Sequence, residues 1–220
     1  MGRKPIKKER IDAPELKKEW VRILTPIYMR KGLRSMNMQV VAKTIGVSKA
    51  TLYKYFSSRE EIIEYALETK LEEIGAFKNQ LFDNSLSFQD RYFHAIFVFF
   101  NGIAGVSNEF LRDLKSMYPN VWKKVEFFRE YTVSMLQLFY ENAIEAGIFK
   151  AVNPHILVMN DKQFFDLISD PDFLNEQNIS IQEAFKDYFT LRISGLFNRS
   201  SDFDINLEEK IKELTLNIRI

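Results

Sequence analysis

The sequence predicts an all-α fold, because three kinds of helical signal recur along its 220 residues. Apolar residues return every three or four positions in one segment after another, which places them on one face of a helix. Serine or asparagine precedes several of these segments, where its side chain can accept a hydrogen bond from a free backbone N–H. Glycine follows others, where it can take the left-handed conformation that ends a helix. Together these signals predict a chain built from consecutive helices.

The charge is unevenly distributed along the chain. Residues 1–60 hold 15 Lys and Arg against 5 Asp and Glu, a net charge of +10. Residues 61–220 hold 16 against 25, a net charge of −9. A basic module joined to an acidic body favours a polyanion at one end of the molecule only.

Composition excludes several classes of protein. A chain without cysteine has no disulfide, thiol nucleophile or cysteine-bound metal, and this fits a reducing, cytoplasmic setting. The basic start leads into no apolar stretch, so we expect no signal peptide. The longest wholly apolar run, Ala95–Phe100, is far too short to span a bilayer, so we expect no membrane partner.

The chain begins with a basic arm and a first helix. Residues 1–13 show no apolar periodicity; such an arm can enter a DNA minor groove, or it can be a solvated terminus. A helix is expected from Pro14 to near Gly32, and Pro26 within it removes a backbone donor and should kink it. The apolar stripe of this helix consists of Leu16, Trp20, Ile23, Leu24, Ile27 and Tyr28.

A helix–turn–helix is predicted between Asn37 and Phe56. The first of its helices has an apolar stripe formed by Met38, Val41, Ala42 and Ile45. Gly46 can end that helix, and Ser48 can cap the second one, in which Leu52 and Phe56 face inward.

The outer face of the second helix carries basic, hydroxyl and aromatic side chains. Such groups can reach phosphates and base edges in a major groove. A helical corner that only packs a core is the alternative, and it leaves this basic face unexplained. The residues of the face are Lys49, Thr51, Tyr53, Lys54 and Tyr55.

About residues 20–65 resemble the TetR (tetracycline-repressor) family, although Pro26 departs from the family pattern. The resemblance rests on Gly32, Gly46-Val47-Ser48, Thr51-Leu52-Tyr53, Tyr55-Phe56 and Arg59-Glu60-Glu61. It implies a helix-turn-helix DNA-binding domain at 14–60, a helical ligand-binding and dimerisation domain at 61–200 and a tail at 201–220. It also implies double-stranded DNA as a partner, contacted by Gln39, Ser48, Lys49, Thr51, Tyr53, Lys54, Tyr55 and Arg59.

Helical signals continue through the rest of the chain. Ser58 with Glu61 reads as a capping box that opens a helix to about Gly75, and Ser87 can cap a second, almost wholly apolar helix. Further helices are expected at 107–118, 119–146, 154–168 and, from a Ser180–Glu183 capping box, 180–198. The alternating apolar residues after 213 leave the tail open between a strand and a docked or disordered terminus.

The body holds 19 of the 20 phenylalanines, enough to form either a plain core or a core around an apolar cavity. Arg91, His94 and Asn101 share one helical stripe and could supply polar contacts there, unless they form a solvent-facing seam. The resemblance implies an apolar small-molecule ligand. Its expected lining is Phe97, Phe100, Trp122, Phe128 and Phe139.

No motif in the sequence indicates catalysis. His94 and His155 are the only histidines, and neither has a second histidine within helical reach. No phosphate-binding glycine loop or nucleophile elbow is present. Carboxylates such as Asp113, Glu126 and Glu130 are explained by an acidic surface. We therefore expect no enzyme, no metal site and no cofactor.

The last helix carries Phe185, Phe189 and Leu196 on one face, and such a stripe must be buried. The resemblance implies a homodimer in which helices 154–169 and 180–198 of each copy form a four-helix interface. The expected function is a ligand-responsive transcriptional regulator, a repressor that binds a pseudo-palindromic operator as a dimer. The alternative is a helical small-molecule-binding or scaffold protein with a vestigial DNA-binding head.

Overall fold

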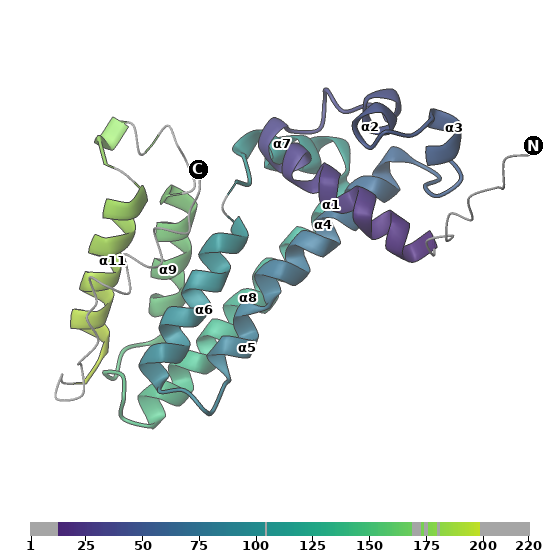
Figure 1. Ribbon diagram of the computed structural model, residues 1–220. Helices are drawn as coiled ribbons and strands as arrows, with labels where there is room; N and C mark the ends of the chain where they lie inside the picture. Colours follow the sequence, from purple (N-terminus) through teal and green to yellow (C-terminus); the bar gives the residue numbers. More distant parts are fainter. Residues whose placement is uncertain (1–12, 104, 169–172, 174–175, 180, 199–220) are drawn as a thin grey trace, which may run out of the picture.

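The computed structural model describes residues 13–103, 105–168, 173, 176–179 and 181–198 (Figure 1). Within these ranges the regular structure is helical apart from one isolated antiparallel bridge between Phe149 and Phe197, so the predicted all-α fold is confirmed. No helix in this part of the chain is long and apolar enough to cross a membrane. The helices are α1 (Ala13–Lys31), α2 (Met38–Thr44), α3 (Lys49–Leu52), α4 (Arg59–Gly75), α5 (Phe77–Leu81), α6 (Phe88–Ile103), α7 (Asn108–Met117), α8 (Pro119–Glu145), α9 (Pro154–Ile168) and α11 (Ile181–Leu196).

The first helix, α1, runs unbroken through Pro26, whose ring lies on the exposed side. The buried side of the helix carries Trp20, Leu24 and Tyr28, as the apolar stripe predicts. Gly32 follows the last helical residue with a φ of +70°, in the left-handed region that glycine takes without strain.

The serine caps form where the sequence places them. Ser87 Oγ accepts from Asp90 N at 3.1 Å at the start of α6, and Ser58 Oγ accepts from Glu61 N at 3.1 Å at the start of α4. The second hydrogen bond of the predicted capping box differs by one residue. Glu61 Oε2 accepts from Ser57 N at 2.7 Å, whereas a capping box would have it accept from Ser58 N.

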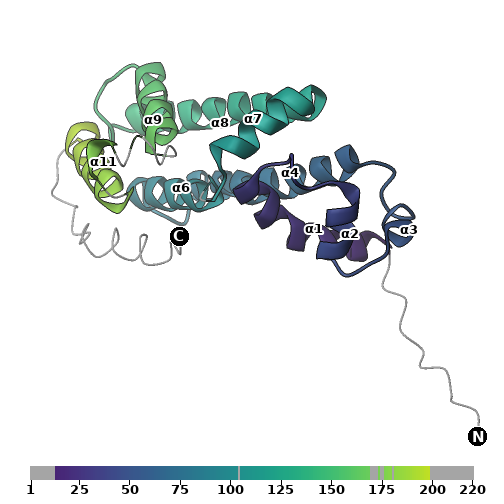
Figure 2. The ribbon, with the colours of Figure 1, turned by 90° about the horizontal axis from the view of Figure 1, so that it is seen from above.

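Two hydrophobic cores are placed side by side along the molecule. Figures 1 and 2 show α4 and α8 extending from one core to the other. The first core, here called the head core, joins α1–α3 and the first half of α4 to α7 and the start of α8. The second, the body core, joins α5, α6 and the second half of α8 to α9 and α11.

The division between the cores does not coincide with residue 60. Phe110, Leu114 and Val121 belong to the head core although they lie far beyond it in the sequence. Helix α7 is therefore a structural part of the head core. The basic arm at 1–12, the Ser180 cap and the tail from 199 lie outside the described residues.

Candidate DNA-binding surface and ligand cavity

The corner between α2 and α3 is held by side-chain caps and one glycine. Asn37 Oδ1 accepts from Gln39 N at 3.0 Å and from Val40 N at 3.1 Å, which starts α2. Gly46 turns the chain with a φ of +74°. Ser48 Oγ then accepts from Thr51 N at 3.0 Å and starts α3. These contacts agree with the corner predicted from the sequence.

The second helix of the corner is shorter than predicted. Regular α-helix ends at Leu52, and a tighter turn carries the chain on, with Lys54 N donating to Thr51 O and Tyr55 N to Leu52 O at 3.1 and 3.0 Å. Such i to i+3 bonds are typical of a 3₁₀ turn at the end of a helix. The turn still directs Tyr53 and Lys54 to the surface.

The predicted DNA-binding residues divide into exposed and packed ones. Tyr53 is 47% exposed, and the ammonium of Lys49 lies 5.8 Å from the centre of its ring. Thr51 and Tyr55 are half-buried, and the Tyr55 ring meets that of Trp20 edge to face at 5.0 Å. The surface presented to solvent, here called the reading face, consists of Gln39, Ser48, Lys49, Tyr53 and Lys54.

Arg59 does not point outward as a phosphate ligand should. Its Nη2 donates to Leu33 O, and its guanidinium lies 5.8 Å from the centre of the Tyr118 ring. The side chain therefore ties the start of α4 to the loop after α1 and to the end of α7. This inward placement does not fit the expected phosphate contact, because the guanidinium is held by the Leu33 carbonyl, which also accepts from Met36 N at 3.2 Å.

Asp113 of α7 fastens the same loop, and the expectation that it belongs to an acidic surface is wrong. Its side chain is 3% exposed and accepts from Leu33 N at 2.9 Å, from Arg34 N at 3.3 Å and from Arg34 Nε at 2.8 Å. Burial alone would raise the pKa of this carboxyl, but the hydrogen bonds from Leu33 and Arg34 outweigh burial and lower the pKa below its usual value. The carboxylate is thus a charged clasp between α7 and the loop after α1.

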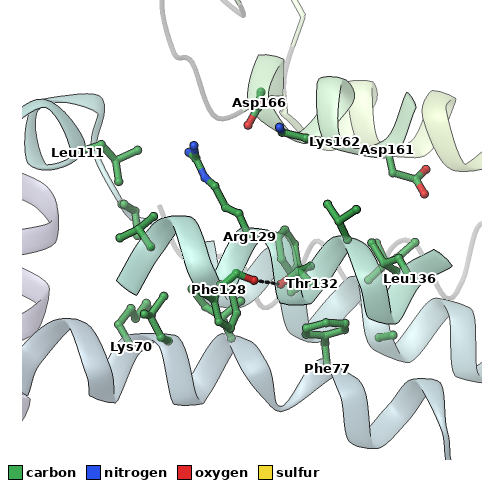
Figure 3. A pocket seen from close by; sticks show the side chains of 18 of the residues that line it. Lys70, Phe77, Leu111, Phe128, Arg129, Thr132, Leu136, Asp161, Lys162 and Asp166 are labelled. Carbon is green, nitrogen blue, oxygen red and sulfur yellow. Dashed lines mark hydrogen bonds between the residues drawn. The ribbon is translucent and has the colours of Figure 1, made fainter. Parts of the chain in front are cut away.

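A cavity of about 370 Å³ is lined by side chains of α4 and α6 on one side and of α7, α8 and α9 on the other (Figure 3). Figure 2 shows the two layers that these helices form. The volume of the cavity is in the range of small-molecule sites. Polar atoms come from Lys70, Arg129, Thr132, Asp161, Lys162 and Asp166. The apolar lining comprises Met29, Leu67, Leu71, Ile74, Phe77, Ala95, Ile96, Phe99, Val106, Phe110, Leu111, Val125, Phe128, Val133, Leu136 and Val158.

Of the residues expected around a ligand, Phe128 lines this cavity. The expected polar stripe of Arg91, His94 and Asn101 does not, and Arg91 Nε instead donates to Leu86 O at 2.9 Å. Phe97 also lies outside the lining, and the side chain of Phe100 lies outside the described residues.

Two more expected lining residues are structural. Trp122 packs in the head core, and its Nε1 donates to Glu126 Oε1 at 2.9 Å. Phe139 packs in the body core, where it stacks on Tyr92 at 6.2 Å. Because α6 and α8 are apolar on several faces, the sequence does not indicate which face borders the cavity.

Beside the cavity lies a buried polar cluster that the sequence did not indicate. Asp161 of α9 is 2% exposed and pairs with Arg192 Nη2 of α11 at 2.6 Å. The hydroxyls of Tyr140 and Tyr188 also donate to its carboxylate. Burial raises the pKa of Asp161, although Arg192 opposes the shift. Tyr188 and Arg192 are one turn apart in α11, but Tyr140 and Asp161 lie on two other helices, so no local pattern joins the whole cluster.

The predicted dimer stripe is only partly described. Leu196 is 2% exposed and packs in the chain's own body core, so its assignment to an interface is wrong. The side chains of Phe185 and Phe189 lie outside the described residues. Other apolar side chains on α9 and α11 are exposed: Ile156 and Met159 at 58% each, and Leu191 at 72%.

Among the described residues, no group of three or more His, Cys, Asp or Glu side chains is placed to hold a metal ion. The corner between α2 and α3, the exposed reading face and the cavity together define a helix-turn-helix protein with a separate pocket.

Comparison with known proteins agrees with this class. Residues 27–66 match the family model described as "Bacterial regulatory proteins, tetR family". The HTH-type transcriptional regulator YvaF of Bacillus subtilis (strain 168), itself uncharacterized, is 22% identical over 164 residues, which are 74% of this chain and 86% of that protein.

Solved structures show the same fold over most of the chain. A TetR-family transcriptional regulator from Marinobacter aquaeolei VT8 has a TM-score of 0.66 at 15% identity, covering 90% of this chain and 98% of the other. The ketosteroid transcriptional regulator KstR2 of Mycobacterium tuberculosis has a TM-score of 0.59 at 16% identity, covering 84% and 96%. Through residues 27–66 the chain is similar to the tetR family of bacterial regulatory proteins, and over most of its length it shares the fold of these solved structures.

Proposed function

We propose that the protein is a ligand-responsive repressor that binds a pseudo-palindromic operator as a homodimer. The observation that carries this proposal is a shared wall: α4 and α7 pack in the head core and also line the cavity. A small apolar molecule in the cavity would therefore press on the elements that hold the reading face. The repressor binds operator in one arrangement of the heads, and the ligand favours another.

The reading face supplies the DNA contacts. Lys49 and Lys54 carry charges for phosphates, while Gln39 and Tyr53 carry groups that reach base edges. Its position in the basic part of the chain, which has a net charge of +10, favours DNA at this end of the molecule.

The clasp at Asp113 supports the transmission of a ligand signal. Leu111 lines the cavity, and Asp113 two residues later in α7 holds the backbone of Leu33 and Arg34 in the head. A displacement of α7 by a ligand would move the loop between α1 and α2 with it.

The exposed apolar residues on α9 and α11 support a dimer. Ile156 and Met159 lie three residues apart in α9, so they share one face, and Leu191 adds a third side chain from α11. A self-complementary interface of these helices would place two heads on successive major grooves, about 34–36 Å apart.

The experiment that tests this function begins with selection of bound DNA fragments from the source genome. The selected operator is then titrated with the parent protein and with two charge variants of equally exposed apolar residues. Leu191 in α11 and Phe127 in α8 are both 72% exposed. We expect Leu191→Asp to give monomers in sedimentation and to lose operator binding, because two linked heads are needed for tight binding.

Phe127→Asp is the matched control and should remain a dimer that binds operator. A parent protein that selects no fragment and shows no salt-dependent duplex binding would contradict the proposal and favour a scaffold or ligand-binding protein. A Leu191→Asp dimer with full operator affinity would exclude this interface.

A further inference from the structure

A second hollow of about 240 Å³ adjoins the ligand cavity. It lies between α1 and α4 and shares Met29 and Lys70 with the lining of the cavity. The two spaces differ in chemistry, because the second is lined mainly by polar and charged side chains. Its other lining residues are Arg22, Thr25, Pro26, Arg30, Thr69, Glu73 and Gly105.

The charge in this second hollow is mainly positive. Arg22, Arg30 and Lys70 face one carboxylate among the lining residues, that of Glu73. Glu73 Oε2 pairs with Lys70 Nζ at 3.1 Å, but the Glu73 side chain is 59% exposed while that of Lys70 is 17% exposed. An exposed i, i+3 pair of this kind contributes little free energy, so a bound anion can replace Glu73 as the partner of Lys70.

The opposite side of the cavity is less suited to an anion. Figure 3 shows Lys70 across the cavity from Asp161, Lys162 and Asp166. Asp161 is neutralised by Arg192 at 2.6 Å, while Lys162 and Asp166 place both signs of charge on α9. Arg129 extends from α8 towards this mixed rim in the same view. The Lys70 end therefore has the larger positive excess: three cations face one carboxylate there, compared with Arg129 and Lys162 against Asp166 at the other end.

We propose that the ligand is an elongated amphipathic anion. Its apolar part fills the cavity, and its carboxylate or phosphate lies against Lys70 at the junction, beside Arg22 and Arg30. This inference rests on the proposed function and names the ligand class for the same cavity. Lys70 is only 17% exposed, and this partial burial strengthens a charge-assisted hydrogen bond to the anionic group. Such a ligand would touch α1 of the head directly.

The test uses three probes with the same ten-carbon chain: decanoate, decanol and decyltrimethylammonium. Their dissociation constants are measured by calorimetry at pH 7.5 with the full chain. We expect decanoate to bind about ten-fold more tightly than decanol, as a partly buried charge-assisted bond would give, and the cationic probe to bind more weakly than decanol. Each probe is also tested for release of the selected operator.

Three lysine and arginine variants locate the anionic group. In Lys70→Met the preference for decanoate over decanol should disappear while decanol affinity stays within about two-fold, since the apolar wall is kept. Arg129→Met, at the mixed rim, and Lys123→Met, on the exposed side of α8, should keep the preference. Loss of the preference in Arg129→Met alone would overturn the placement at Lys70.

The remaining outcomes separate this inference from the proposed function. Equal binding of decanoate and decanol, with operator release by both, would overturn the anionic ligand and support a ligand-responsive repressor. Failure of all three probes to bind would overturn both the anionic ligand and the use of this cavity as an apolar ligand site.

Discussion

The two cores of this molecule are built for different tasks. In the head core, Leu24, Leu52 and Phe56 are completely buried by the helices around them. Where the head core meets the body core, apolar side chains from both surround a cavity of about 370 Å³. Under the proposed function, the head would hold a few side chains in a fixed arrangement for DNA, whereas the cavity would leave room for a ligand.

Helix α7 packs on α1 and α4 through apolar side chains, and two polar contacts lie within this packing. Asp113 and Arg59 bind the Leu33 region through hydrogen bonds that have definite directions. Apolar contacts tolerate small sliding movements, but a buried carboxylate must keep its donors or incur a large penalty. In the proposed mechanism, these contacts would carry a movement of α7 to the loop after α1.

Removing one phenyl ring from the head core and one from the cavity wall should give the largest difference in the free energy of unfolding. Phe56→Ala in the head core should lower the free energy of unfolding by about 3–5 kcal/mol, because the core loses the buried ring and a cavity is left in its place. Phe128→Ala should cost less than half as much, because this ring already borders a cavity. Urea titration followed by fluorescence measures both, since Trp20 lies against Phe56 at 6.5 Å. Equal costs would show that the cavity is filled by other side chains in solution.

Replacing one buried alanine in each region by leucine tests whether there is room for extra atoms, which the head core should lack and the cavity should have. Ala42 in α2 is 3% exposed in the head core, and Ala95 in α6 is 1% exposed at the cavity wall. Ala42→Leu should cost about 1–3 kcal/mol through overpacking. Ala95→Leu should be neutral or stabilising by up to about 1 kcal/mol while it weakens decanol binding. A destabilised Ala95→Leu protein would contradict the open cavity.

The clasp at Asp113 should respond to removal of one charge. In Asp113→Asn one accepting oxygen becomes an NH2 group, which cannot accept from the N–H groups of Leu33 and Arg34. We therefore expect the free energy of unfolding to fall by about 2 kcal/mol at pH 7. The pKa of Asp113 is lower in the folded protein than in the unfolded chain, so its contribution is complete above about pH 4 and is lost as the pH falls further. The difference between parent and variant should therefore shrink in acid. Glu130→Gln, on the exposed side of α8, is the control and should show neither effect.

The head could be predicted in detail because its signals are local. The caps at Ser48 and Ser58, the turn at Gly46 and the inward position of Leu52 each depend on residues within a few positions of one another. Arg59 is the exception, because its partner Leu33 is 26 residues away. The sequence offers no signal for that contact.

The cavity could not be predicted to the same extent for a geometric reason. Its wall takes single side chains from α1 and α5 and short stripes from five other helices, and periodicity does not distinguish a cavity-facing stripe from a core-facing one. Helix α6 shows this clearly: Phe99 lines the cavity and Phe97 does not. Leu196 likewise has the apolar pattern of an interface residue but is buried within its own chain.

The smallest expected effect separates the surface of the head from that of the body. Lys54 is exposed on the reading face, and Lys123 is exposed on α8, where its Nζ donates to Asn120 Oδ1 at 3.3 Å. Neither Lys54→Ala nor Lys123→Ala should change the free energy of unfolding by more than about 0.5 kcal/mol, because neither side chain fills a core. Lys54→Ala should nevertheless reduce the slope of log K against log salt by about 0.9 per head, or roughly 2 for a dimer, since each lost phosphate contact releases one counterion fewer. Fluorescence anisotropy with the selected operator at several salt concentrations measures this slope. Lys123→Ala should leave the slope unchanged, and an equal change in both variants would mean that the slope reports overall charge instead of a contact made by the reading face.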